Sequence, residues 1–230
     1  ELLARGLGDR HPGAGGVVVV DIGGATTDVH SVIEPDHEDA LLDADGLARE
    51  VVATTPVTRT VEGDLGMRWS AVSTVTEAGL DRDPELAAAA ALRTADPGLL
   101  PRSETDWLAD EQIARAAATL ALRRHAGRAR VVVGPDGRVV ERTGKDLREV
   151  RLVVGSGGVL RNGRPGVADR VLGGTVGDHQ EGGWQLPRRA LVTVDRDYVL
   201  AAAGLLAADH PYAAYRLARR VVDGAALAGQ

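Results

Sequence analysis

Residues 17–33 read VVVVDIGGATTDVHSVI, and this stretch decides how the rest of the chain is interpreted. Its first four residues are all apolar and β-branched, as in a buried strand, and they lead directly into Asp21. Gly23 and Gly24 then predict a tight turn into a second strand, whose residues alternate between apolar and polar. Two strands joined by a turn of Gly, Ala and Thr present several backbone N–H groups in one concavity, a geometry that binds phosphate oxygens. We therefore interpret this stretch as a phosphate-binding hairpin.

An ordinary hairpin is the alternative, because Asp and Gly also form simple turns. Three features favour phosphate binding: the fully apolar first strand, the position of Asp21 where ligands bind in α/β sheets, and the hydroxyls of Thr26 and Thr27. Magnesium sites commonly use only one or two protein carboxylates beside the phosphates. Asp21 is therefore predicted to hold Mg²⁺ through water, or to orient an attacking water.

Composition limits the class of protein. A chain of 230 residues forms one large domain or two small ones, and 44% hydrophobic with 26% charged residues indicates a globular protein. The net charge of −6 argues against a nucleic-acid partner. The absence of cysteine excludes disulfides and thiolate metal sites and fits a reducing compartment. No signal peptide or membrane-length apolar run is visible, so we expect a cytoplasmic protein with no membrane partner.

The remaining pattern predicts a mixed sheet flanked by helices, and hence the α/β class. The expected strands lie at 50–57, 150–154 and 191–194, with a β-hairpin at 131–140. The expected helices lie at 85–93, 110–125, 198–208 and 211–222, and residues 59–68 are expected to lead into a further helix. Asp110 is predicted to be the N-cap of the helix at 110–125. The acidic, turn-rich residues 34–46 are expected to form a solvated excursion.

A second glycine cluster occurs at residues 152–160, which read LVVGSGGVL. Glycine permits positive φ and has no Cβ, so a base, ribose or phosphate can approach the backbone closely. A helix that begins near Val159 would add free N–H groups and favour anions. By itself such a turn serves tight packing equally well, but together with the upstream hairpin it predicts a nucleotide site.

Together these two loops resemble the second lobe of the actin-like ATPase superfamily, which includes sugar kinases, DnaK-like chaperones and actin. The superfamily's second phosphate motif is similar to residues 21–28, and its adenosine motif is similar to residues 153–159. The resemblance implies a ribonuclease H-like, five-stranded mixed sheet with a β-hairpin insertion, and ATP or ADP with Mg²⁺ as cofactors. The superfamily's first phosphate motif has no counterpart here and the chain opens at Glu1, so we expect a fragment whose missing first lobe is a partner.

Several strings narrow the resemblance to the glutamate mutase accessory family, called GlmL or MutL and distinct from the mismatch-repair protein of the second name. They are DIGGATTDVHSV, TVEGDLGMR, GKDLREV, VVGSGGVL and the ending at 197–206. The family implies a partner, an adenosylcobalamin-dependent mutase, and related reactivating factors use ATP to release damaged cobalamin from the inactivated enzyme. Residues 1–230 are then one lobe, with the phosphate hairpin at 17–33, a helical segment at 64–127, the β-hairpin at 131–140, the adenosine loop at 152–160 and a C-terminal strand and helices at 190–222.

The resemblance also implies roles for individual residues. Asp21 and Thr26 are assigned to catalysis, with the Thr26 hydroxyl on the γ-phosphate. Thr27 is the less favoured alternative for that contact, because strand alternation turns its side chain away. The backbone of Gly23, Gly24, Ala25 and Thr26 is assigned to the β- and γ-phosphates. Asp28 matches an acid near the metal, and a plain polar residue on the strand face explains it as well.

The nucleoside is assigned to the second glycine cluster, namely Gly155, Ser156, Gly157 and Gly158. Gly63, Asp64 and Gly66 match a ribose or purine contact, and a helix cap explains them nearly as well. The histidines show no metal-ligand spacing, so no zinc site is predicted, and His30 is interpreted as structural.

Three functions are compatible with these residues. The first is the nucleotide-binding lobe of a chaperone-like ATPase that reactivates a cobalamin enzyme. The second is a small-molecule kinase or a hydantoinase-like ATP-dependent enzyme, and the third is an actin-like polymerising scaffold. A kinase needs a catalytic base for its acceptor hydroxyl, and none is identifiable here. Since ATP needs contacts from both lobes, ATPase activity is expected of the full-length protein and hardly any of this chain alone.

Overall fold

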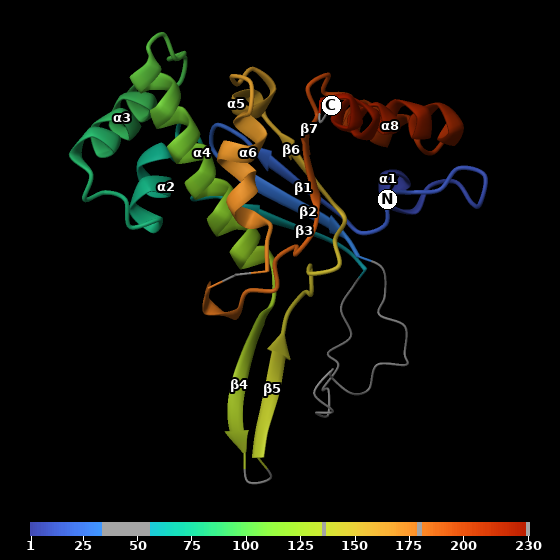
Figure 1. The fold of residues 1–230 in the computed structure, drawn as a ribbon. Helices are drawn as coiled ribbons and strands as arrows, with labels where there is room; N and C mark the ends of the chain where they lie inside the picture. The colour runs from blue at the N-terminus through green and yellow to red at the C-terminus, as the bar shows by residue number, and fades with distance from the viewer. Residues whose placement is uncertain (34–55, 135–136, 179–180, 229–230) are drawn as a thin grey trace.

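A five-stranded mixed sheet forms the centre of the computed structural model, which describes residues 1–33, 56–134, 137–178 and 181–228 (Figure 1). The strand order is β3-β2-β1-β6-β7. The strands are β1 (Val17–Ile22), β2 (Thr27–Val32), β3 (Val57–Glu62), β6 (Leu152–Ser156) and β7 (Leu191–Val194). β1, β2 and β3 form an antiparallel meander, whereas β6 and β7 extend the sheet in parallel with β1. The carboxyl ends of β1, β6 and β7 therefore lie at the same edge of the sheet.

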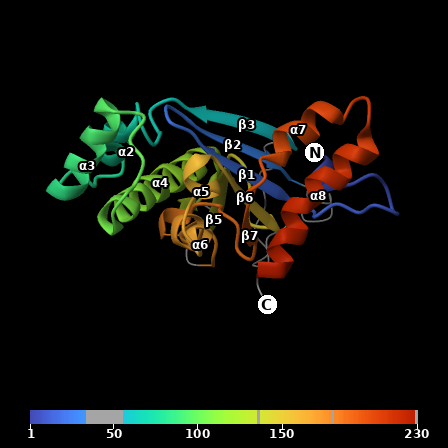
Figure 2. The same ribbon diagram turned by 90° about the horizontal axis from the view of Figure 1, so that it is seen from above.

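Helices cover both faces of this sheet (Figure 2). They are α1 (Leu2–Arg5), α2 (Ala71–Glu77), α3 (Pro84–Ala95), α4 (Glu104–His125), α5 (Gly158–Arg161), α6 (Val167–Leu172), α7 (Val199–Leu206) and α8 (Pro211–Ala228). Gly173–Thr175 and Glu181–Gly183 form short 3₁₀ turns.

Strand alternation divides the core between the two faces. Val18, Val20 and Ile22 of β1 join the larger apolar cluster, which includes residues of α4 and α6. Val17, together with residues of β6, joins a second cluster with α1, α7 and α8. Asp21 points to the side of this second cluster, because it alternates with Val20 and Ile22, and it is only partly buried.

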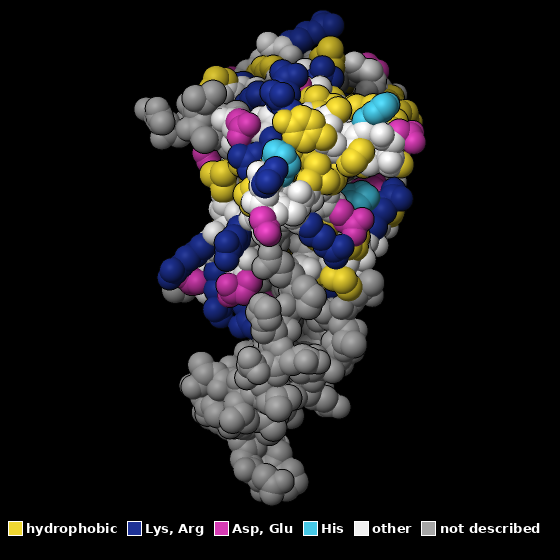
Figure 3. Space-filling view, turned by 90° about the vertical axis from the view of Figure 1, so that its right-hand side faces the viewer, with side chains coloured by type: hydrophobic (Ala, Val, Ile, Leu, Met, Phe, Trp, Pro, Cys, Tyr) yellow, Lys and Arg dark blue, Asp and Glu magenta, His cyan; other side chains and the backbone are white. Residues whose placement is uncertain are grey.

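The face with α1 and α8 is the one turned towards the viewer in Figure 3, where hydrophobic side chains are interspersed with arginine and histidine. The ring of His11 lies 5.1 Å from the ring of Tyr212 and 5.5 Å from that of Tyr215, measured between centroids. The Tyr215 hydroxyl donates to the Pro12 carbonyl at 2.8 Å, so α8 is tied to the N-terminal segment.

The predicted hairpin at 131–140 is confirmed and is longer than expected. β4 (Arg128–Gly134) and β5 (Gly137–Thr143) form a separate two-stranded antiparallel sheet, which projects from the body of the protein (Figure 1). The strand expected at 191–194 is also confirmed. The strand expected at 150–154 begins and ends two residues later. A short helix, α5, begins next to Val159, where the sequence allowed for one, whereas α6 was not predicted.

One expectation about the middle of the chain was wrong, and another falls largely outside the described residues. The helix expected to begin at Asp110 begins at Glu104, because Ser103 and Asp106 form a capping box that satisfies its first N–H groups. Asp110 is therefore inside α4 and buried. The expected strand at 50–57 falls largely outside the described residues. The strand that the structure describes here is β3, Val57–Glu62, whose residues pair with β2 in continuous antiparallel register.

Candidate functional site

The turn between β1 and β2 is closed by a hydrogen bond from the Gly23 N–H to the Thr26 carbonyl at 2.9 Å. Three turn carbonyls accept hydrogen bonds from the segment before α2: Gly23 from the Met67 N–H at 2.9 Å, Gly24 from the Arg68 N–H at 2.8 Å, and Ala25 from the Ser70 hydroxyl at 2.6 Å. The N–H groups of Gly24, Ala25 and Thr26 make no hydrogen bond with any described residue. The carbonyl groups of the turn thus fix it to its neighbours, while three of its N–H groups remain available, as an anion site requires.

Two glycines permit this close packing. A Cβ on Gly66 would lie 2.6–2.8 Å from the backbone of Gly24 and Ala25, and a Cβ on Gly24 would lie 2.8 Å from the ring of Trp69. Gly66, which the sequence associated with ribose or purine, therefore serves the contact between two backbone segments. The Trp69 ring remains 64% exposed beside the turn.

Asp21, Asp28 and Ser156 lie on one face of the sheet. Asp21 is opposite Asp28 in the antiparallel pair β1–β2 and opposite Ser156 in the parallel pair β1–β6, and paired residues on neighbouring strands point to the same side. Thr27 alternates with Asp28 and points into the core, where it is fully buried and its hydroxyl has no partner. The structure therefore does not bring the Thr27 side chain to the candidate site.

The two aspartates have different surroundings. The Asp28 carboxylate accepts hydrogen bonds from Arg59 of β3 at 2.6 and 3.0 Å, and from the Thr26 hydroxyl at 3.2 Å. The Asp21 side chain makes no hydrogen bond or ion pair with any described residue. Arg59 thus neutralises Asp28, which favours the strand-face interpretation of that residue. Asp21 is the carboxylate that remains available to a cation.

The glycine loop after β6 contains residues with separate tasks. A Cβ on Gly157 would lie 2.2 Å from the Ile22 carbonyl oxygen, and its φ of 104° is unfavourable for other residues, so only glycine fits beside the end of β1. Gly155 faces the core, where a Cβ would lie 2.5–2.7 Å from Leu160 and Leu172. Gly158 is exposed with nothing within 4 Å of such a Cβ. Gly155 and Gly157 therefore serve packing, whereas Gly158 leaves an open backbone at the start of α5.

Asp64 belongs to a surface ion network. Arg124 of α4 contacts Asp64 at 2.8 Å, Glu62 at 2.9 Å and Glu77 at 3.0 Å. Hydrogen bonds to Glu62 and then to Asp64 raise the pKa of Arg124 above its usual range. The neighbouring Gly63 carbonyl accepts a hydrogen bond from the Ser70 hydroxyl at 3.3 Å. The structure thus gives Gly63 and Asp64 roles in holding the connection from β3 to α2.

Tyr198 was missed by the sequence reasoning and lies at the same edge of the sheet. Among the described residues it is the one non-glycine with positive φ, at 56°, a conformation that is costly for an aromatic residue. Arg161 lies over its ring at 4.9 Å from the centroid. Burial and then the charge of Asp21 raise the pKa of the Tyr198 phenol. The signal in the sequence that could have identified Tyr198 is its position directly after Asp197, within the string at 197–206 that resembles the family.

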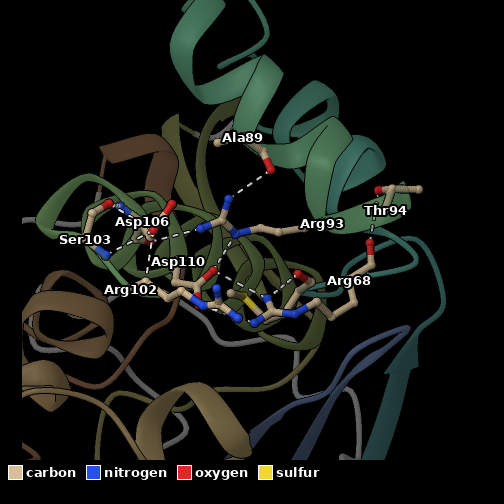
Figure 4. Close-up of polar contacts among 9 residues, drawn as sticks. Arg68, Ala89, Arg93, Thr94, Arg102, Ser103, Asp106 and Asp110 are labelled. Atoms are coloured by element: carbon tan, nitrogen blue, oxygen red, sulfur yellow. Dashed lines mark hydrogen bonds and ion pairs between the residues drawn. The ribbon is translucent and has the colours of Figure 1, made fainter. Parts of the chain in front are cut away.

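A buried ion cluster anchors the segment that holds the turn (Figure 4). Asp110 of α4 accepts hydrogen bonds from Arg93 of α3 at 2.5 Å and from Arg68 at 3.3 and 3.4 Å. Arg93 is 2% exposed and also donates to the carbonyls of Ala89 and Asp106 at 2.9 Å. Because the Arg68 N–H donates to the Gly24 carbonyl, α3 and α4 are linked to the turn between β1 and β2 through one residue.

His125 forms a second buried polar cluster on the core face of the sheet. Its Nε2 lies 2.8 Å from the Ser31 hydroxyl and its Nδ1 lies 2.9 Å from the Thr60 hydroxyl. The side chain is 2% exposed. Burial, and then the charge of Lys145, lower the pKa of His125 to about 4.

This shift predicts acid destabilisation. Unfolded His125 has an ordinary pKa near 6.5 and binds a proton before the folded form does, so the stabilising contribution is complete above that pH and is lost as pH falls towards 4. The free energy of unfolding should fall by up to about 3 kcal/mol across this window. Urea unfolding at several pH values measures it, and His125→Gln should have a shallower slope. An unchanged slope in the variant would contradict the assignment.

The fold and site together define a mixed α/β protein with a candidate anion site at the carboxyl ends of its central strands. The chain belongs to the MutL family, the glutamate mutase accessory proteins, since the family model described as MutL protein matches residues 1–222. Protein MutL of Clostridium tetanomorphum is 34% identical over 228 residues, which cover 95% of this chain and 47% of that relative. The chain thus spans about half the length of the relative. The family predicted from the sequence is confirmed.

Two features are absent from the described part of the chain. None of its helices combines the length and apolar character that a membrane span requires. No group of three or more His, Asp or Glu side chains converges there as a metal cage would. A cation at Asp21 would therefore take its other ligands from phosphate and water, which is how Mg²⁺ is commonly bound.

Proposed function

We propose that this chain is the nucleotide-binding lobe of an ATP-dependent accessory protein that reactivates an adenosylcobalamin-dependent mutase. The observation that carries the proposal is the turn at 23–26, whose carbonyls are engaged while three N–H groups are available, next to the unpaired carboxylate of Asp21. Family membership supports the association with a mutase. The sheet supports a ribonuclease H-like, actin-like lobe, because three antiparallel strands are extended by two parallel ones.

The residues present fit Mg²⁺ and a nucleoside di- or triphosphate. The N–H groups of Gly24, Ala25 and Thr26 would bind phosphate oxygens, and Asp21 would hold the metal through water. The bound metal would supply charge neutralisation on the phosphates. Gly158 would leave room for the nucleoside, which Arg161 and Tyr198 would border.

The Thr26 hydroxyl has a smaller role in this proposal than the sequence suggested. It donates to Asp28 in the structure, so its contact with a γ-phosphate would require it to leave that bond. The N–H of Gly23 is used inside the turn and is not available to phosphate. Phosphate binding therefore rests on the three following N–H groups.

Nucleotide binding by the isolated chain should be weak. A single lobe contacts the phosphates from one side, whereas positioning for transfer needs contacts from both sides. Titration with a fluorescent ATP analogue should give a dissociation constant at least about tenfold higher for the 230-residue chain than for the complete protein, with hardly any hydrolysis. Equal affinity and turnover in the two proteins would contradict this prediction.

The reactivation assay tests the function itself. The complete protein is mixed with mutase inactivated by damaged cobalamin, with and without Mg-ATP, and cobalamin release is followed by absorbance together with recovered mutase activity. We expect both to require Mg-ATP. A phosphorylated metabolite in an activity screen would instead favour a kinase, and nucleotide-dependent light scattering would favour a polymerising scaffold.

A further inference from the structure

Four arginines surround a cavity at the amino ends of β6 and β7. Its volume is about 490 Å³, and Arg148, Arg151, Arg188 and Arg189 line it. Because β6 and β7 run parallel to β1, this cavity lies at the opposite end of these strands from Asp21 and the phosphate turn. It is therefore separate from the proposed nucleotide site.

Backbone hydrogen bonds hold the two arginine-bearing loops together. The Leu147 N–H donates to the Gln185 carbonyl at 2.9 Å, and the Arg188 N–H donates to the Arg148 carbonyl at 3.2 Å. The Leu191 N–H donates to the Arg151 carbonyl at 2.9 Å, where the two strands begin to pair. The arginines thus come from two segments whose relative position is set by the sheet, and they are gathered before any ligand arrives.

The positive charge of this cavity is only partly neutralised. Arg148 pairs with Asp146, and Arg188 lies 4.0 Å from Asp178, with both side chains of the second pair about half exposed. An exposed pair at that distance contributes little. Arg151 and Arg189 are exposed, and their side chains make no hydrogen bond or ion pair with any described residue. Among the described residues, Glu149 is the one further acid in the lining.

This arrangement is unusual for the chain. The chain carries a net charge of −6, and two other pairs of neighbouring arginines each share a carboxylate: Arg164 and Arg170 share Glu111, and Arg68 and Arg93 share Asp110. Guanidinium groups gathered around one cavity repel each other unless an anion lies between them. Each guanidinium also presents a planar fork that binds a carboxylate or phosphate through two hydrogen bonds.

We propose that this cavity binds a small polyanion, a ligand with two or more phosphate or carboxylate groups. Arg151 and Arg189 supply the available forks, and Arg148 and Arg188 form the walls between them. The volume is that of a small-molecule site rather than of a macromolecular surface. The proposal does not depend on nucleotide binding at the other end of the sheet.

Calorimetric titration of the complete protein with pyrophosphate, and separately with citrate, tests the proposal. Each titration is run without nucleotide and without Mg²⁺, because ADP itself carries two phosphate groups and both probes chelate Mg²⁺; the arginine variant then assigns the heat of binding to this cavity. At least one probe should bind the wild type, and R151E/R189E should weaken that binding by about tenfold or more. Binding of pyrophosphate alone would identify phosphate groups, and binding of citrate alone would identify carboxylates.

R10E/R216E is the matched control, since Arg10 and Arg216 are also exposed and their replacement changes the net charge equally. It should retain wild-type affinity for the probe. R151Q/R189Q removes both charges without reversing them. Its thermal unfolding midpoint, compared with that of the wild type, separates loss of ligand binding from loss of folding. Equal weakening by both charge reversals, or no binding of either probe at millimolar concentration, would overturn the proposal.

Discussion

Asp21→Asn in the complete protein should lower ATP hydrolysis by about 100-fold or more. The substitution preserves the size of the side chain and removes the negative charge that would hold Mg²⁺. The Asp21 carboxylate forms no ion pair with a described residue, so its replacement leaves no positive side chain without a partner. The variant should therefore fold normally. Phosphate release at saturating ATP, measured across a range of Mg²⁺ concentrations, gives the result.

Asp28→Asn is the matched control for this prediction. Asp28 lies directly opposite Asp21 on the neighbouring strand, but its carboxylate is held by Arg59. We therefore expect its loss to cost less than about tenfold in hydrolysis, with a small loss of stability from the broken, partly exposed ion pair. Wild-type hydrolysis in Asp21→Asn would refute the role of Asp21. Equal losses in both variants would mean that the two carboxylates act as one unit.

Asp110→Ala should destabilise the fold by about 3–5 kcal/mol. The substitution leaves the buried Arg93 guanidinium without its carboxylate, and Arg68 loses the same partner. Urea unfolding measures the change. Asp64→Ala provides the comparison, because its ion pair with Arg124 is partly exposed to solvent and should contribute at most about 1 kcal/mol.

The same variant should also weaken nucleotide binding. Arg68 connects the cluster to the phosphate turn, since its N–H bonds the Gly24 carbonyl. Replacement of both buried partners, Arg93→Met with Asp110→Leu, should recover most of the lost stability because no uncompensated buried charge remains. Asp110→Ala unfolding within 1 kcal/mol of wild type would show that the cluster is not electrostatically required.

Local patterns predicted the elements that carry the candidate site. The apolar run before Asp21, the small residues of the turn and the alternation after it led to a strand–turn–strand unit, and the structure has it. The β-hairpin and the strand at 191–194 were equally visible, because period-2 apolar patterns bounded by turn residues are local signals. The start of α4 was misplaced, because Asp110 and Ser103 are both suitable caps and only Ser103 has its capping partner.

The sequence by itself determined which residue types stand at the ends of the central strands, because hydrophobic periodicity and turn formation depend on residues only a few positions apart. It also determined family membership, through strings along most of the chain. Only the tertiary structure decided how those residues divide their tasks. Asp28 is neutralised by an arginine from another strand, Gly155 serves packing, and Tyr198 comes close to the charge of Asp21. The physical reason is that ion pairing, burial and close backbone approach depend on register and packing between segments far apart in the chain.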